Sequence, residues 1–214
     1  MTIDFRQLRE NMVEQQVRPW EVVDMRVLEA LNAIPREDFV PESQRANAYA
    51  DTSLPLGHGE YMMKPVVEGR CLQGLLPQAH ERVLEIGTGS GYLTACLARM
   101  SSHVTSLEID EMLAERARTN LSAQGIQNIE VVEADAMNWS SEATFDVVCV
   151  TGAVTEVPAH FLKWLAPTGR MFVVRGQSPV MEAIVRHADG RTDSLFETDL
   201  PYLKGAAPAP SFKF

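Results

Sequence analysis

Hydrophobic positions in the middle of the chain alternate between short runs and helical spacing, and this pattern predicts an α/β protein. Residues 83–86 form an aliphatic run typical of a buried strand, and Leu93, Leu97 and Met100 then recur as on one face of a helix. Strands that alternate with helices indicate a parallel sheet covered on both faces and joined by right-handed crossovers. Downstream, the pattern predicts strands at 103–109, 129–135, 145–151 and 170–174, and helices between Asp110 and Gly125 and at 156–165.

The N-terminal part of the chain carries a different pattern. Apolar residues spaced among charges predict two amphipathic helices, over residues 4–17 and 24–33. Residues 52–65 contain Pro and Gly without a regular period, so they predict a long ordered loop, followed by a helix at 66–76.

At the C-terminal end, residues 180–187 and 195–200 flank an Asp189-Gly190 turn and predict an antiparallel hairpin at the sheet edge. The predicted fold is therefore α/β, with a doubly wound and mostly parallel sheet, an N-terminal helical addition and this hairpin. The length suits one domain. We expect a single unit over residues 1–214, made of a helical cap at 1–50, the loop at 52–65 and an α/β core at 66–214.

A strand, a glycine-rich turn and a helix follow one another from residue 83, which is how an α/β sheet opens a nucleotide site. Gly87, Gly89 and Gly91 stand at alternate positions, and glycines let the backbone approach a ligand with no Cβ in the way. A dinucleotide fingerprint needs its third glycine three residues after the second, and Tyr92 occupies that position. The spacing therefore disfavours a nicotinamide cofactor, and because no GK[ST] follows, it also excludes a P-loop.

Acidic residues mark the ends of three successive predicted strands. Glu85 precedes the first glycine, where a carboxylate would repel a phosphate; Glu108 is placed to accept hydrogen bonds from ribose hydroxyls, and Asp135 from an adenine amino group. S-adenosyl-L-methionine contains adenine, ribose, a sulfonium and an amino acid but no phosphate, so all three acids fit it. The candidate cofactor-binding residues are Glu85, Gly87, Thr88, Gly89, Gly91, Tyr92, Glu108, Ile109, Asp135, Ala136 and Thr151.

Composition restricts the other classes of function. The formal net charge is −10 and no cluster of Lys and Arg stands out, which disfavours nucleic acid as a partner because its phosphates are bound mainly by basic residues. No apolar run approaches the ~20 residues that span a bilayer, and the charged N-terminus is unlike a signal peptide, so we expect no membrane association and a cytoplasmic location. Cys71, Cys96 and Cys149 are expected to be reduced core residues, and the histidines show no spacing typical of a metal site.

The chain resembles a class I methyltransferase, and more narrowly the protein-L-isoaspartate O-methyltransferase family. The resemblance covers nearly the whole chain and implies a seven-stranded Rossmann-like sheet, S-adenosyl-L-methionine as cofactor with S-adenosyl-L-homocysteine as product, and a role in protein repair. It also implies that the glycine turn lines the methionine part of the cofactor. It rests on VLEIGTGSGY at 83–92, SLEID at 106–110, VTGAVTEVP at 150–158, LPLGHGE at 54–60 after Asp51, and the Ile34-Pro35-Arg36 and Phe39-Val40-Pro41 pieces.

The loop at 52–65 departs from that family. Typical members read GxxxSQP, with a serine near the methyl acceptor, whereas this chain reads GEYMMKP at 59–65 and has Met63 at the serine position and Lys64 at the glutamine. A lost hydrogen bond to a charged acceptor is worth about 1.5 to 3 kcal/mol, and an ion pair between Lys64 and the acceptor is a hypothesis for its replacement. Thr151, at the end of a strand, is expected to border the acceptor as well. Another departure is Asp135-Ala136, where the family often has Asp-Gly.

The function predicted from these residues is carboxyl O-methylation of L-isoaspartyl (D-aspartyl) residues in a protein or peptide substrate. Methyl transfer is an in-line displacement that depends on positioning, and a carboxylate with a pKa of about 3.9 needs no general base. Three alternatives stay open: a different acceptor on the same scaffold, a cofactor-binding module without catalysis, and a nicotinamide oxidoreductase. The sequence indicates no oligomeric state.

Overall fold

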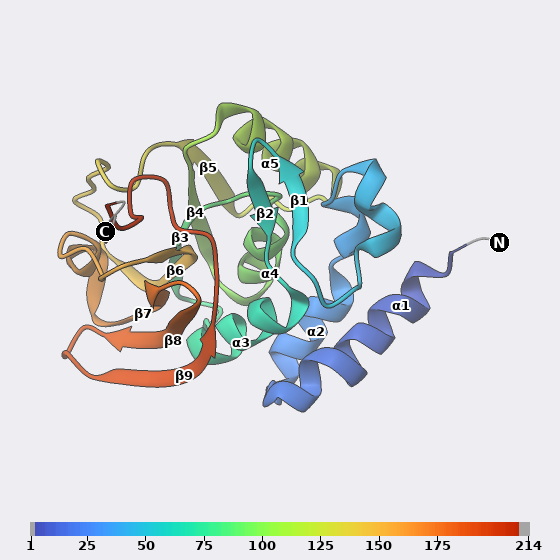
Figure 1. Ribbon diagram of the computed structural model, residues 1–214, viewed down its shortest axis with the longest axis horizontal. Coiled ribbons are helices and arrows are strands. Elements are labelled where there is room, and N and C mark those ends of the chain that lie inside the picture. Colours follow the sequence, from blue (N-terminus) through green and yellow to red (C-terminus); the bar gives the residue numbers. More distant parts are fainter. Residues whose placement is uncertain (1–2, 210–214) are drawn as a thin grey trace, which may run out of the picture.

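A computed structural model describes residues 3–209 of the chain, and its centre is a seven-stranded sheet (Figure 1). The strand order is β5-β4-β3-β6-β7-β8-β9, parallel from β5 to β7 and antiparallel from β7 to β9. This arrangement confirms the predicted fold class. The strands are β3 (Arg82–Ile86), β4 (His103–Glu108), β5 (Ile129–Glu133), β6 (Phe145–Val154), β7 (Leu165–Gln177), β8 (Val180–His187) and β9 (Thr192–Thr198).

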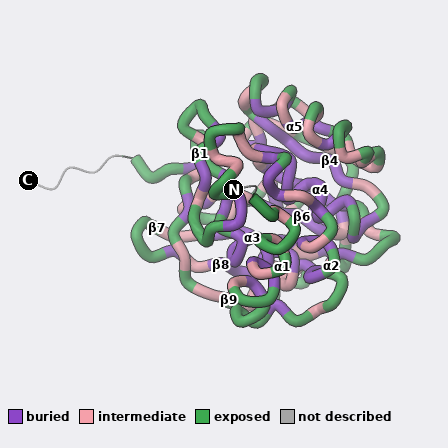
Figure 2. Tube along the Cα trace, turned by 90° about the vertical axis from the view of Figure 1, so that its right-hand side faces the viewer, coloured by how far each residue is buried: buried purple, intermediate pink, exposed green. Residues whose placement is uncertain are grey.

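One face of the sheet is covered by helices. Helices α3 (Pro65–Leu75), α4 (Tyr92–Met100) and α5 (Glu111–Ala123) pack their apolar stripes against the strands, and the side chains of Leu72, Leu97 and Leu121 are fully buried there. The carboxylate of Asp110 caps α5 by accepting hydrogen bonds from the backbone N–H groups of its first turn. Figure 2 shows the buried positions gathered along the central strands and the inner sides of these helices.

The opposite face is covered by irregular segments, and here the prediction of a helix at 156–165 is wrong. The structure has only a short 3-10 helix, η5 (Phe161–Trp164), because Leu165 already belongs to β7 and pairs with Phe145. Three residues per turn place Phe161 and Trp164 on the same side, where their rings stack with centroids 4.9 Å apart. The side chains that cover the second face come from this single turn, from residues 134–139, and from Val157, Leu203 and Ala206.

The predicted N-terminal helices are present. Helix α1 (Phe5–Asn11) begins at the Asp4 cap and continues through a π-helical stretch, η1 (Met12–Val17), and a 3-10 turn, η2 (Arg18–Trp20). Helix α2 (Met25–Ala33) begins at the Asp24 cap. Two further 3-10 helices, η3 (Arg36–Asp38) and η4 (Glu42–Asn47), lead toward the sheet. In Figure 1, α1 lies on the opposite side of the molecule from β7, β8 and β9.

The loop predicted at 52–65 is ordered but contains regular structure that the prediction missed. Strands β1 (Leu54–Gly57) and β2 (Glu60–Met62) form an antiparallel hairpin. Its turn is built from Gly57, His58 and Gly59, which all have positive φ, at 93°, 57° and 82°. Two glycines make this left-handed turn accessible. The hairpin therefore holds the segment before α3 close to the carboxyl ends of the strands.

Candidate functional site

A cavity opens at the carboxyl ends of the parallel strands. In the sheet, β3 lies between β4 on one side and β6 on the other, so the strand order reverses beside it, and ligands of open α/β sheets bind at such a switch point. The cavity encloses about 1050 Å³, part of it open to solvent. Its walls come from the turn after β3, the ends of β4, β5 and β6, the β1–β2 hairpin and residues 200–204.

The structure brings most of the predicted site residues together around this cavity. Lys64, Glu85, Gly91 and Tyr92 were predicted at the site but do not line it. The predicted residues that do line it are Met63, Gly87, Thr88, Gly89, Glu108, Ile109, Asp135, Ala136 and Thr151.

The glycine turn is held open by the end of β6. Gly87 has φ of +91°, and a Cβ placed on it would lie 2.3 Å from the hydroxyl oxygen of Thr151. That hydroxyl bonds to the carbonyl oxygens of Ile86 and Gly87, at 2.9 and 2.8 Å. Thr151 therefore fixes the backbone of the turn.

Glu108 and Asp135 present carboxylates to the cavity from neighbouring strand ends. Glu108 Oε2 accepts a 2.8 Å hydrogen bond from the backbone N–H of Gly89, and its Oε1 one of 3.0 Å from Asp110. Asp135 Oδ1 accepts from the backbone N–H of Met137 at 2.9 Å. These backbone donors fix both carboxylates, whose remaining lone pairs can accept hydrogen bonds from hydroxyl or amino groups of a ligand.

Glu85 lies beneath the cavity and not in its wall. Its side chain is completely buried, and Ser106 Oγ donates to Oε2 at 2.6 Å beside a bond from Thr94 Oγ1 at 2.5 Å. Burial raises the pKa of Glu85 to about 8. The carboxyl is therefore largely neutral at pH 7, and the prediction that its charge repels a phosphate is not supported. Its visible role is to join β3, β4 and α4 under the glycine turn.

Gly91 and Tyr92 pack in the core beside the glycine turn and do not line the cavity. Gly91 has φ of +86°, and a Cβ there would come within 3.2 Å of Leu121, so this glycine permits close packing of α4 against α5. Tyr92 is 1% exposed, and its ring lies under the Arg36 guanidinium with 4.7 Å between the guanidinium carbon and the ring centroid. Both residues shape the site from the core.

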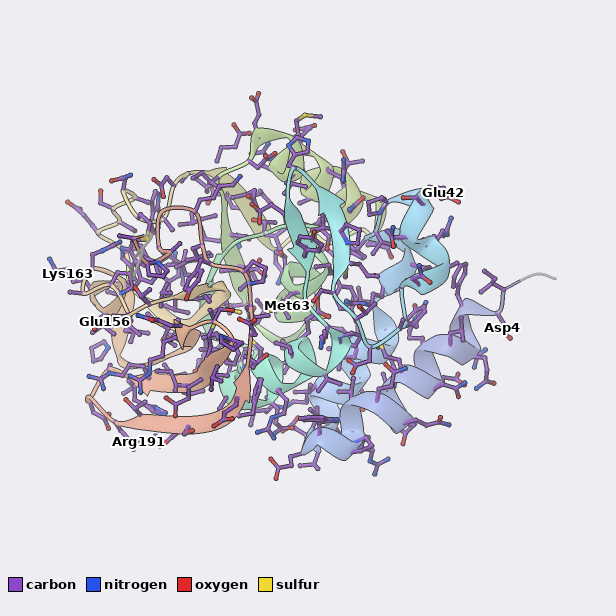
Figure 3. All side chains as sticks on the ribbon, viewed as in Figure 1. Asp4, Glu42, Met63, Glu156, Lys163 and Arg191 are labelled. Atoms are coloured by element: carbon purple, nitrogen blue, oxygen red, sulfur yellow. The ribbon has the colours of Figure 1, made fainter. Side chains whose placement is uncertain are left out.

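On the other side of the cavity, Met63 follows the hairpin and precedes α3 (Figure 3). Its side chain is buried and lines the cavity, while its carbonyl accepts a 2.6 Å hydrogen bond from Arg36 Nη2. Lys64 is exposed and occupies the cap position of α3. The cavity's basic side chain is instead Lys204, whose Nζ lies 3.4 Å from Glu60 Oε1 and 3.9 Å from Asp110 Oδ2.

Sequence reasoning missed three charged residues in the cavity wall, Glu60, Glu68 and Lys204. Glu68 had a usable signal, because it interrupts the apolar run Pro65-Val66-Val67 inside a helix that is buried along most of its length. Lys204 had none, since only the folding back of the C-terminal segment brings it to the hairpin. His58, in the turn of the hairpin, has its Nδ1 2.9 Å from Asp110 Oδ2.

The three cysteines are free and buried, as predicted for core residues. Sγ of Cys71 lies 3.4 Å from Sγ of Cys149, a proximity that their separation in sequence concealed. Within residues 3–209, no group of three or more His, Cys, Asp or Glu side chains is arranged to hold a metal ion. Likewise, none of the helices in that range is long and apolar enough to cross a membrane.

Comparison with known proteins places this fold and cavity in a family. Residues 7–203 match the family model described as protein-L-isoaspartate(D-aspartate) O-methyltransferase. The protein-L-isoaspartate O-methyltransferase of Myxococcus xanthus is 42% identical over 166 residues, which cover 77% of this chain and 78% of the relative. That of Methanoculleus marisnigri is 38% identical over 192 residues, covering 89% and 87%.

Solved structures agree. A candidate protein-L-isoaspartate O-methyltransferase from Plasmodium falciparum, in complex with S-adenosyl-L-homocysteine, superposes with a TM-score of 0.81 at 21% identity and covers 94% of this chain and 99% of that one. A further protein-L-isoaspartate O-methyltransferase gives 0.78 at 26% identity, covering 91% and 65%. The fold and the cavity define a class I methyltransferase. Within that class, the chain belongs to the protein-L-isoaspartate(D-aspartate) O-methyltransferase family.

Proposed function

We propose that this protein binds S-adenosyl-L-methionine in the cavity at the switch point and transfers its methyl group to the side-chain carboxylate of L-isoaspartyl residues in proteins or peptides. The observation that carries the proposal is the set of polar groups in the cavity wall of a chain that belongs to this family. Glu108 and Asp135 offer hydrogen-bond acceptors to a ribose and an adenine, and the glycine turn leaves the backbone open. No lining residue offers the basic groups that a pyrophosphate prefers, apart from Lys204 at the rim.

The chain's own residues orient the reactants. Bound cofactor supplies a methyl group on a sulfonium. Thr151 fixes the turn at Gly87, and Met62 and Met63 give the acceptor side an apolar wall. An acceptor carboxylate is already ionised at neutral pH, so alignment is the main requirement and no residue has to remove a proton.

A transfer assay tests the proposal. Protein is incubated with S-adenosyl-L-methionine labelled in its methyl group and with two peptides of the same composition, one containing L-isoaspartate and one L-aspartate. We expect base-labile label in the isoaspartyl peptide only. The variant Asp135→Asn, which places an amide N–H₂ group beside the bound adenine amino group, is expected to weaken cofactor binding about tenfold and to lower the label accordingly.

Two results would contradict the proposal in different ways. Cofactor binding without methylation of the isoaspartyl peptide rejects the acceptor and leaves another acceptor on the same scaffold, an alternative that the thioether of Met63 in place of a serine hydroxyl favours. Failure to bind the cofactor at all rejects the assignment of the cavity.

A further inference from the structure

Glu68 brings a buried carboxylate to the cavity wall. It lies in the first turn of α3 and is only 2% exposed. Its Oε2 is paired with Arg36 Nη1, and within residues 3–209 no hydrogen-bond donor contacts Oε1. Unlike Oε1 of Glu85, Oε1 of Glu68 is not sealed from solvent. The cavity is therefore where this second oxygen can meet a ligand.

Glu68 lies at the end of the cavity that is next to α4. Arg36, which pairs with Glu68, lies over the ring of Tyr92 in the first turn of α4. Ser90 and Leu93 line the same cavity beside the glycine turn. Glu108 and Asp135 lie at the ends of β4 and β5, on the other side of that turn.

The charged side chains around the cavity differ between its rim and its α4 end. At the rim, Lys204 lies between two carboxylates, with Nζ 3.4 Å from Glu60 Oε1 and 3.9 Å from Asp110 Oδ2. At the α4 end, Glu68 is the charged side chain of the wall. Because Arg36 pairs with Oε2, Oε1 is left as a hydrogen-bond acceptor, and an ammonium group there would gain a charge-assisted hydrogen bond that a carboxylate cannot make.

We propose that Glu68 binds the α-ammonium group of the methionine part of the cofactor. This inference rests on the cofactor half of the proposed function and is independent of the isoaspartyl acceptor. Arg36 is then a positioning residue, because its bonds to the carbonyl oxygens of Ala48 and Met63 hold the guanidinium that orients Glu68.

Proton linkage gives the contact a signature of its own. Burial raises the pKa of Glu68 to about 7, against the opposing effect of Arg36. An ammonium group beside Oε1 favours the ionised form and lowers this pKa, so binding releases a proton near pH 7 and affinity increases as the pH rises through that value. The titratable or charged groups that face this site are Arg36, Tyr92, Glu85, Cys96 and Cys149.

A double-mutant-type cycle, in which two forms of the protein are each titrated with two ligands, tests the proposal. Wild type and Glu68→Gln are titrated calorimetrically with S-adenosyl-L-homocysteine and with 5′-(3-carboxypropylthio)-5′-deoxyadenosine, the analogue that lacks the amino group. We expect Glu68→Gln to weaken S-adenosyl-L-homocysteine binding about 10- to 100-fold and to change binding of the analogue by less than about threefold. Equal losses for both ligands would overturn the proposal, because a purely structural effect does not depend on the amino group.

Glu37→Gln is the matched control. Glu37 is another buried carboxylate paired with an arginine, Arg9, at 3.1 Å, and it lies outside the cavity wall. Its substitution also leaves an arginine, here a partly buried one, without its counter-charge. We expect a loss of stability with both ligand affinities within about twofold of wild type, since no ligand contact is removed.

Measurements on the wild-type protein keep the test decisive where Glu68→Gln does not fold. Binding heats at pH 7 in two buffers of different ionisation enthalpy give the number of protons released. We expect release with S-adenosyl-L-homocysteine and less with the analogue. Equal proton release with both ligands contradicts the role of Glu68. If neither ligand binds, both this inference and the cofactor assignment are contradicted. The peptide assay tests the acceptor separately.

Discussion

At the residue scale, Glu85 illustrates how burial changes a side chain's chemistry. The unfolded carboxyl has an ordinary pKa of 4.5, and burial raises the folded value to about 8. Below pH 4.5 both states are protonated. As the pH rises from 4.5 to 8, only the unfolded state gains stability by ionising, so the free energy of unfolding falls across this window. Each pKa unit corresponds to about 1.4 kcal/mol, so the loss amounts to a few kcal/mol.

We therefore expect Glu85→Gln to reduce the decline in stability between pH 5 and pH 8, by an amount on the order of a few kcal/mol. The amide carbonyl can still accept the hydrogen bonds of Thr94 and Ser106. Urea unfolding at a series of pH values measures the effect, and Glu130→Gln, an exposed position on β5, is the control. A variant as sensitive to pH as the wild type would show that Glu85 is not the titrating group.

Met63 gives a second prediction at this scale, for the acceptor. Met63→Ser restores a hydroxyl at the position where typical family members have serine. We expect kcat/KM for an isoaspartyl peptide to rise about 10- to 100-fold, the value of a hydrogen bond to a charged acceptor. Met62→Ser is the control, because Met62 is also buried in the cavity wall. If Met63→Ser and Met62→Ser change kcat/KM to the same extent, the hydroxyl has no special effect at position 63 and the comparison with the family serine fails.

At the element scale, the turn between β3 and α4 depends on glycine for two separate reasons. Gly87 has a positive φ, and a Cβ there would also collide with the Thr151 hydroxyl at 2.3 Å. Gly190 has a similar φ of +96° in the β8–β9 turn, but a Cβ there meets nothing within 4 Å. Alanine substitutions at Gly190 and Gly87 therefore distinguish the cost of backbone strain alone from the cost of strain together with a steric clash.

We expect Gly190→Ala to lower the free energy of unfolding by about 1 kcal/mol and Gly87→Ala by about 2 to 4 kcal/mol. Gly87→Ala is also expected to weaken S-adenosyl-L-homocysteine binding at least tenfold, because it displaces the turn that lines the cavity. Chemical denaturation and calorimetry measure both effects. Equal losses of stability would mean that Thr151 moves aside at little cost.

At the scale of the whole molecule, Arg36 connects the N-terminal helices to the site. Its guanidinium is fully buried and bonds to the carbonyl oxygens of Ala48 and Met63 as well as to Glu68. These contacts join η3, the segment before the hairpin and α3. We infer that the helical cap and the α/β core unfold together as one domain.

Arg36→Met is expected to lower the free energy of unfolding by about 3 to 5 kcal/mol, because it leaves the Glu68 carboxylate buried without its partner. Arg191→Met is the control: Arg191 is 56% exposed and pairs with Asp193 at the surface, and the expected change is below about 1 kcal/mol. Fluorescence and circular dichroism should report a single coincident transition. Two separated transitions would contradict the single domain.

The seven strands of the main sheet, most helices, the glycine turn and the residues Glu108 and Asp135 could be predicted from the sequence, because these depend on local periodicity and on the rule that parallel strands end at one edge. It failed at 156–165, where an apolar pattern suits a 3-10 turn as well as a helix, and at Glu85, whose charge depends on burial. The orientation of Lys64 toward solvent and the arrival of Lys204 at the cavity became known from the tertiary structure alone, whereas Glu68 had a signal in the sequence that the prediction did not use. The positions of Lys64 and Lys204 follow from the way the hairpin and the C-terminal segment pack against distant parts of the chain, which local sequence does not encode.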